Sequence, residues 1–299
     1  MTGLEITLLY LLAAVLGVVG CRLLKLPRLN QIKGTLIIVP IVNTYGFVQQ
    51  SRYLPDRRDL NRSFPGSEKG SLGSRMAFQF TDKILKYCTH AIDLHTGAIH
   101  RSNLPQVRAS AKDKVALRMA EVFNAPIIIK AASRDGTMRG TANNLGIPLL
   151  LYEAGEALRF DELSVRSGVN GVLNVMAHLG MIQPHPEATS ITLPARCRRA
   201  IWVRAPRGGL CTLQQKSGDA VKKGEVIGRV AGIFGDDAIE FRAPIDGIII
   251  GHAVLPVVNQ GDALVHIAEV MRFGDVEQRV DQITEALLND RLLDEDELI

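Results

Sequence analysis

The sequence has few of the features that mark secreted, nucleic-acid-binding or disordered proteins. Its 299 residues contain four cysteines, none in a C-x-x-C spacing. This argues against a zinc ribbon or a disulfide scaffold and fits a reducing compartment, so we expect the protein in the cytoplasm. A net charge of +4 and 5% aromatic residues argue against nucleic-acid binding. With 46% hydrophobic residues the chain is globular, and its length predicts about two domains.

No basic residue precedes the apolar run at residues 6–20. Glu5 stands where a signal peptide carries positive charge, and the run is shorter than the roughly 20 apolar residues that span a bilayer. We therefore predict a buried helix here, stopped by Pro27. The alternative is a lipoprotein anchored through Cys21, because residues 18–21 resemble a lipoprotein cleavage box.

Short apolar runs alternate with helical patterns up to about residue 183. The predicted strands lie at 35–42, 91–94, 126–129 and 148–152, and the predicted helices at 76–87, 112–123 and 161–179. This alternation predicts an α/β layer with a largely parallel sheet and flanking helices. The long irregular stretch at 44–75 is typical of a functional loop.

From about residue 195 the sequence changes to short strands separated by glycine, and it repeats. Arg-Ala-Pro at 204–206 recurs at 242–244, and Val-x-x-Gly at 221–224 recurs at 258–261. Two such halves suit a small β-sandwich and resemble the biotinyl/lipoyl barrel-sandwich domain. Carriers of that type bear a lysine on the turn between the halves, and no lysine follows Lys223, so we do not expect a carrier function.

A histidine ends one of the predicted buried strands. His95 belongs to the segment DLHTG at 93–97, and ligand crevices of open α/β sheets lie at the carboxyl ends of strands. Neutral imidazole is a common metal ligand, and Asp93 could orient the ring. A single histidine is more often structural, so this residue alone leaves both interpretations open.

Two further segments carry chemically useful side chains. Asn61 and Arg62, in DLNRSFPG at 59–66, indicate a carboxylate clamp, because the guanidinium fork matches a carboxylate; a surface salt bridge is the commoner alternative. The positive charge of Arg52 nearby favours an acidic substrate. Glu153, in YEAGE at 152–156, follows another buried strand and could act as a general base, although a solvated helix start would give the same pattern.

Together these segments resemble one family. PIVN at 40–43, then DLNRSFPG, DLHTG and YEAGE, are similar in order to the succinylglutamate desuccinylase/aspartoacylase family, zinc hydrolases with a carboxypeptidase-like fold. The resemblance covers residues 3–182, and many members carry a C-terminal barrel-sandwich. It implies that His95 is a zinc ligand, that Asn61 and Arg62 hold a substrate carboxylate, and that Arg52 polarises the scissile carbonyl. It also implies that Glu153 moves a proton from zinc-bound water to the leaving amine.

One element of that family is missing from the sequence. Members take two more zinc ligands from a His-Gly-Asp-Glu element at the end of the first strand, and residues 1–20 contain no histidine. We therefore expect the chain to begin just downstream of those ligands and to lack the strand that carries them. Either the start is assigned at an internal methionine, or the chain is a shortened, metal-free relative. Neither His90 nor His100 has the family position.

The resulting expectation is a carboxypeptidase-like hydrolase domain at 1–186, a barrel-sandwich domain at 187–272 and an acidic helical tail at 273–299. The implied activity is zinc-dependent cleavage of an amide or ester in a small N-acylated amino acid or related carboxylate. Catalytic zinc normally has three protein ligands, so we expect this chain to be inactive or severely impaired. The alternative is a non-catalytic anion-binding or assembly protein. We expect a small-molecule carboxylate substrate and no nucleic-acid or membrane partner. The sequence is compatible with a homo-oligomer.

Overall fold

The computed structural model describes residues 7–12, 17–184, 193–235, 237–270, 273–274 and 276–290. The strands in chain order are β1 (Thr7–Leu12), β2 (Thr35–Val39), β3 (His90–His95), β4 (Arg101–Ala109), β5 (Ile127–Lys130), β6 (Leu149–Gly155), β7 (Ala195–Arg204), β8 (Gly209–Leu213), β9 (Ala220–Val221), β10 (Val226–Ala231), β11 (Ile239–Arg242), β12 (Gly247–Ala253), β13 (Val257–Val258) and β14 (Ala263–Val270). The helices are α1 (Gly17–Lys25), α2 (Thr44–Val48), α3 (Leu72–Lys83), α4 (Lys114–Phe123), α5 (Met138–Asn144), α6 (Glu162–His178) and α7 (Val276–Leu288), with 3-10 turns η2 (Pro27–Gln31), η3 (Leu60–Arg62) and η4 (Leu85–Tyr87).

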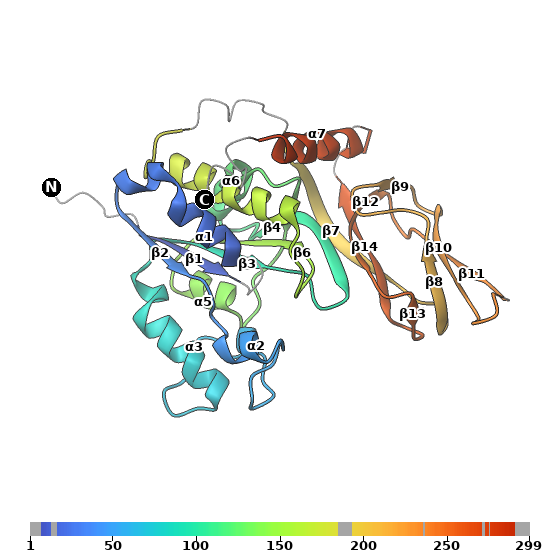
Figure 1. The fold of residues 1–299 in the computed structure, drawn as a ribbon, viewed down its shortest axis with the longest axis horizontal. Helices are drawn as coiled ribbons and strands as arrows, with labels where there is room; N and C mark the ends of the chain where they lie inside the picture. The colour runs from blue at the N-terminus through green and yellow to red at the C-terminus, as the bar shows by residue number, and fades with distance from the viewer. Residues whose placement is uncertain are drawn as a thin grey trace.

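The fold is mixed α/β, with helices on both faces of one large sheet (Figure 1). The ten strands of this sheet follow the order β2-β1-β3-β6-β4-β5-β7-β14-β12-β9. The first four strands run parallel to one another, and β4 is antiparallel to β6 but parallel to β5. A four-stranded sheet of order β11-β10-β8-β13 lies at one end of the molecule.

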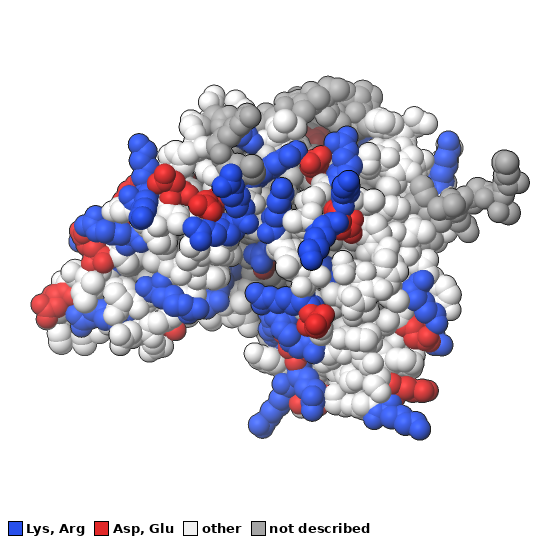
Figure 2. Space-filling view, turned by 180° about the vertical axis from the view of Figure 1, so that it is seen from behind, with Lys and Arg blue, Asp and Glu red and all other residues white. Residues whose placement is uncertain are grey.

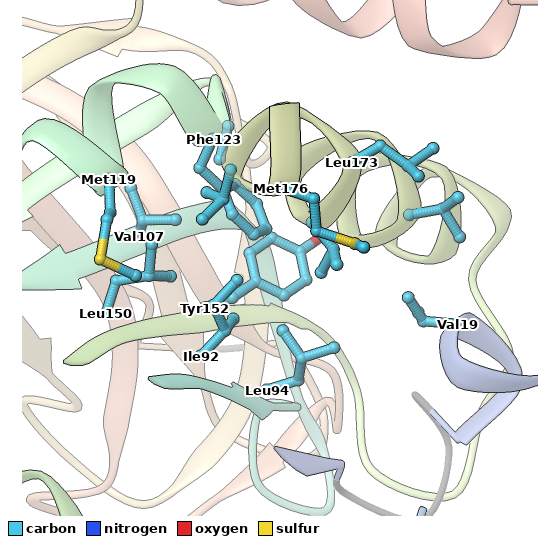
Figure 3. Packing of buried hydrophobic residues seen from close by; sticks show 14 of the residues in the cluster. Val19, Ile92, Leu94, Val107, Met119, Phe123, Leu150, Tyr152, Leu173 and Met176 are labelled. Carbon is cyan, nitrogen blue, oxygen red and sulfur yellow. The ribbon is translucent and has the colours of Figure 1, made fainter. Parts of the chain in front are cut away.

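One face of the large sheet forms the main hydrophobic core. Alternate residues of β3 and β6, such as Leu94 and Tyr152, point to this face, where α1, α4 and α6 cover them. Figure 3 shows the ring of Tyr152 close to Phe123 and Met176, and the Phe123 and Tyr152 ring centroids are 5.0 Å apart. Each such fully buried side chain stabilises the fold by about 1.5–3 kcal/mol.

The residues between these point to the opposite face, which α3 and α5 cover near the amino ends of the strands. Ala91 and Leu149 pack there against Phe80 and Met138. Further along the same strands this face carries the polar side chains of Asp93, His95 and Glu153 instead. The apolar packing on this face therefore ends before the carboxyl ends of β3 and β6, where polar side chains take its place.

The prediction of one buried helix over residues 6–20 is wrong. Residues Thr7–Leu12 form strand β1, and α1 begins only at Gly17. A short apolar run without periodicity suits a buried strand as well as a buried helix, so the pattern could not decide. Strand β1 pairs with β2 and with β3, where Tyr10 lies opposite Ile38 and Ile92. We expected the chain to lack the strand that carries the family's two further zinc ligands; β1 lies between β2 and β3, and its residues Thr7–Leu12 include no histidine.

The other N-terminal predictions are largely confirmed. Strands β2, β3, β5 and β6 and helices α3, α4 and α6 lie at or near the predicted ranges. The polar strand β4 and the short helix α5 were not predicted. Cys21 lies within α1, and in the described part of the chain no helix combines the length and the apolarity needed to cross a bilayer.

Only β8, β10, β11 and β13 of the C-terminal strands form a sheet of their own, and the others join the large sheet. Strand β7 continues the large sheet beside β5, and β12 pairs with both β14 and β4. The four-stranded sheet packs on these strands through a cluster that includes Phe241, Ile249 and Leu264. The predicted tail helix is confirmed as α7, whose Val276, Val280, Ile283 and Leu287 are buried. The Pro-His-Pro linker predicted at 184–186 lies mostly outside the described residues.

Candidate active site

His95 and Glu153 end neighbouring parallel strands on the same face of the sheet. They are register partners across β3 and β6, so their side chains project together at the carboxyl edge. Asp93 points to this face as well, and His95 Nε2 lies 2.8 Å from Asp93 Oδ2. A carboxylate that holds one ring nitrogen fixes the imidazole and leaves Nδ1 for a ligand, which is the usual arrangement of a metal-binding histidine.

The surroundings of His95 favour positive charge at the ring. Burial alone would lower the pKa of His95, but the charge and hydrogen bond of Asp93 and the charge of Glu153 outweigh it, and the pKa is raised. The charge of Arg52 acts in the opposite direction, which places this guanidinium within electrostatic reach of the ring. The same negative field would favour a bound cation.

Strand β4 brings an arginine to the carboxylate of Glu153. Gln106 lies opposite Glu153 in the antiparallel β4–β6 pair, and Arg108, two residues on, shares its face. The NH2 atom of Arg108 is 2.7 Å from Glu153 Oε2. The sequence analysis missed Arg108, because a contact between residues on different strands leaves no local spacing pattern. Its one signal was the alternation of polar 106 and 108 with apolar Val107 and Ala109.

Helix α5 adds a second arginine that the sequence analysis also missed. Arg139 donates from NH2 to Ala132 O at 2.8 Å. Burial and the charge of Arg108 lower its pKa, while the charges of Asp93 and Glu153 oppose this, so Arg139 belongs to the same electrostatic cluster. In the part of the chain that the structure describes, Arg108 Nε and Arg139 NH1 are buried without a hydrogen-bond partner. A ligand oxygen that accepted from them would satisfy both.

Asn61 and Arg62 lie beside the start of the same helix. Asn61 Oδ1 accepts from Met138 N, the first residue of α5, at 3.0 Å. Arg62 NH1 donates to Asn61 O at 2.6 Å, and Asp59 caps the turn by accepting from Asn61 N at 2.9 Å. The structure therefore places both residues next to the helix that carries Arg139, with the amide nitrogen of Asn61 left as a donor.

Arg52 is anchored at the rim rather than in the centre. Its Nε and NH2 both donate to Asp59 Oδ2, at 2.9 and 2.8 Å, and its side chain is 54% exposed. Two of its five N–H groups are thus used by Asp59, and those of NH1 and the second N–H of NH2 can approach a carbonyl.

Two glycines let the loops after β3 and β6 pack directly on each other. A Cβ on Gly97 would lie 2.2 Å from Arg101 O and 2.8 Å from Gly155 O. Gly155 itself has φ +64°, a conformation that favours glycine. This close packing explains the glycine in both DLHTG and YEAGE, and it fixes the loops that follow His95 and Glu153.

The described residues do not complete a zinc site. Catalytic zinc normally needs three protein ligands, and among the described residues no three His, Cys, Asp or Glu side chains gather around one point. His90 lies at the other end of β3, and His100 contacts Glu156, its backbone N–H donating to Oε1 at 3.0 Å. Residues 13–16, which follow β1, read Ala-Ala-Val-Leu and lie outside the described residues.

On the face of the molecule shown in Figure 2, Lys and Arg side chains gather around a hollow near the middle. Clustered positive charge of this kind attracts anions and raises their local concentration. It agrees with the arginines that the site itself contains.

Comparison with known proteins agrees with this architecture. Residues 18–179 match the succinylglutamate desuccinylase/aspartoacylase catalytic domain. The chain is 30% identical over 260 residues, 82% of its length and 75% of the relative's, to the N-alpha-acetyl-L-2,4-diaminobutyric acid deacetylase of Halomonas elongata.

Solved structures show the same likeness. A succinylglutamate desuccinylase/aspartoacylase from Rhodobacter sphaeroides superposes with a TM-score of 0.77 at 27% identity, over 90% of this chain and 87% of that one. The product-bound ectoine utilization protein EutE (DoeB) from Ruegeria pomeroyi gives 0.79 at 25%, over 89% and 86%. The family is one of hydrolytic deacylases. This chain therefore belongs to the succinylglutamate desuccinylase/aspartoacylase family.

Proposed function

We propose that the protein is a deacylase that cleaves the amide or ester of a small N-acylated amino acid or related carboxylate. The observation that carries this proposal is the register pairing of Glu153 with His95 at the carboxyl edge of the sheet. In this proposal Glu153 takes a proton from the attacking water and passes it to the leaving amine. Arg52 steadies the oxyanion through an N–H group that does not donate to Asp59.

The arginines support a substrate that carries a carboxylate. Arg108 Nε and Arg139 NH1 are buried donors with no partner among the described residues, and an anionic oxygen is their natural acceptor. We propose that Asn61 and Arg62 hold the substrate carboxylate from the adjoining turn. The Halomonas relative is named for an N-acetylated amino acid, which agrees with this class.

We propose that the cofactor of the complete site is one zinc ion, which when bound would supply an activated water. Of the described residues, His95, oriented by Asp93, fits the role of a ligand, but two further ligands are not among them. Because catalytic zinc normally has three protein ligands, we propose that this chain is inactive or strongly impaired.

Metal analysis and hydrolysis assays test the proposal together. The purified chain is assayed with N-acetyl and N-succinyl amino acids, with and without added zinc, while bound metal is measured by elemental analysis. Slow release of the acyl group that depends on added zinc supports an impaired deacylase, and turnover at a rate ordinary for an enzyme would contradict the proposed impairment. Zinc-independent hydrolysis would overturn the assignment of the cofactor.

A non-catalytic anion-binding or assembly protein is the second candidate. It is favoured by the absence of a three-ligand metal cluster among the described residues and by the two guanidinium nitrogens that have no hydrogen-bond partner there, Arg108 Nε and Arg139 NH1. Calorimetric binding of an N-acetylated amino acid, without metal and without turnover, would identify it.

We also propose the domain organisation from the sequence: a carboxypeptidase-like domain at 1–186, a barrel-sandwich at 187–272 and a tail at 273–299. The two-sheet packing around Phe241 and Ile249 supports the barrel-sandwich. All four cysteines are free, which supports a cytoplasmic location. The mass of the protein in solution tests whether it forms a homo-oligomer.

A further inference from the structure

A continuous line of polar contacts joins the C-terminal strand β12 to Glu153. Gln106 Nε2 donates to Ile250 O on β12 at 3.2 Å and to Leu104 O at 3.3 Å. Gln106 Oε1 accepts from Arg108 NH2 at 3.3 Å. The same NH2 group lies 2.7 Å from Glu153 Oε2. The line therefore runs from a backbone carbonyl through an amide and a guanidinium to a carboxylate.

The chemistry of its neighbours fixes the orientation of the Gln106 amide. A guanidinium only donates, so it must face the amide oxygen, and the two backbone carbonyls only accept, so they must face the amide nitrogen. A flipped amide would lose these contacts inside the protein, where Gln106 has 0% exposure. The side chain is thus held in one position, and it presents its oxygen to Arg108.

Arg108 in turn depends on this oxygen. Its side chain is 27% exposed, and its Nε has no partner among the described residues, so the contacts of NH2 with Gln106 and Glu153 are what orient the guanidinium. Gln106, Arg108 and Glu153 lie on one face of the paired strands β4 and β6, and the position of each side chain depends on the other two.

We propose that Gln106 is a positioning residue: anchored to β12, it orients Arg108, and Arg108 holds the carboxylate of Glu153 in its working position. This inference rests on the proposed role of Glu153 as the base. It makes the geometry of the base depend on how the C-terminal strands dock against β4. The competing interpretation is that Gln106 only satisfies the carbonyls of Ile250 and Leu104.

Crystal structures of variants give a test that needs no activity. Gln106→Met keeps the length and bulk of the side chain and removes its hydrogen bonds, while Gln106→Asn keeps the amide but shortens the side chain by one methylene. In both we expect the Arg108–Glu153 distance to grow beyond the about 4 Å limit of an ion pair. An unchanged distance would overturn the proposal. If Gln106→Met does not fold, Gln106→Asn decides.

A double-mutant cycle separates positioning from simple packing. We expect Gln106→Met to lower kcat by about tenfold or more with KM within about twofold, because small misplacements of a catalytic group are costly. In the Arg108→Met background the same change should cost less than about twofold, since Gln106 acts through Arg108. Costs that multiply in the double variant would show that Gln106 does not act through Arg108.

Gln215→Met is the matched control. It removes the amide of a partly buried glutamine that donates to Glu225 outside this line of contacts, and it should leave both kcat and the Arg108–Glu153 distance unchanged. If the unaltered protein is too impaired to give a measurable kcat, the kinetic test has no readout, and the crystallographic Arg108–Glu153 distance alone decides the role of Gln106.

Discussion

Glu153 lies directly beside His95, although the two residues come from strands separated by β4, α4, β5 and α5 in the chain. Both strands run in the same direction and in register, so a residue at the end of one meets a residue at the end of the other. Arg108 then reaches Glu153 from the antiparallel strand on its other side. The candidate site is therefore formed by the pairing of β3, β6 and β4, and no single segment of the sequence contains it.

We expect Glu153→Gln to abolish most of the hydrolytic activity. The amide keeps the size of the carboxylate but cannot accept a proton, and loss of general base catalysis typically costs 10²–10⁴-fold, so we expect kcat to fall by at least about 100-fold. Steady-state release of the free amino acid measures this. Glu121→Gln, which alters an exposed ion pair with Arg118, is the control. A rate close to that of the unaltered protein would show that another group is the base.

Two substitutions of Asn61 should separate its structural role from substrate binding. Asn61→Leu removes the acceptor for Met138 N and should lower the free energy of unfolding by about 1–2 kcal/mol. Asn61→Asp keeps an acceptor, so we expect little change in stability, but its negative charge should raise KM for a carboxylate substrate about tenfold or more. Urea unfolding and steady-state kinetics measure the two effects. An unchanged KM in Asn61→Asp would remove Asn61 from the substrate site.

The stability of the protein should fall in mild acid because of His266. Burial, followed by the charges of Arg108 and Arg101, lowers the pKa of His266 to about 3 from its usual 6.5. The folded protein thus keeps this ring neutral while the unfolded chain binds a proton below pH 6.5. The contribution to stability is complete above pH 6.5 and is lost as the pH falls towards 3, at about 1.36 kcal/mol per pH unit, or about 2 kcal/mol at pH 5.

Unfolding in urea at pH 8 and pH 5 measures this slope. His266→Phe keeps an aromatic ring against Trp202, which stacks on His266 with centroids 4.4 Å apart, and should reduce the difference between the two pH values. An equal difference in the variant would assign the acid sensitivity to other groups.

The tail helix α7 should contribute strongly to stability. Ile283 is 3% exposed, and Ile283→Ala should cost about 2–5 kcal/mol through lost burial and the cavity that remains. Gln278→Ala, on the exposed side of the same helix, should change stability by less than about 0.5 kcal/mol. Thermal or chemical denaturation compares them. Equal stability of the two variants would mean that α7 is not packed as described.

The sequence predicted well the elements whose composition matches their environment. Strands β3 and β6 are short, apolar and followed by polar motifs, so their position and the residues at their ends could be found. Strand β4 could not, because one of its faces carries Gln106 and Arg108 in place of apolar residues. Helix α5 is short and rich in Gly, Thr and Asn, which favour turns when considered locally.

The sequence predicted individual residues of the site but not the contacts between them. His95 and Glu153 were identified from motifs, and their pairing follows from parallel strands. Arg108 and Arg139 could not be identified, because their place depends on which strands become neighbours and on how α5 lies across them. The apolar run that became β1 and part of α1 shows the complementary limit, since a short run that is apolar throughout lacks the periodicity that separates strand from helix.

The pairing of β7 with β5 and of β12 with β4 determines how the protein can be divided into fragments. A fragment cut before β7 would bare two rows of unpaired backbone groups and the apolar cluster that Val276 and Val280 of α7 help to close. Such a fragment should aggregate and should not fold independently. Thermal unfolding should accordingly occur in one cooperative transition, because β7, β12, β14 and α7 belong to the same folding unit as β3 and β6.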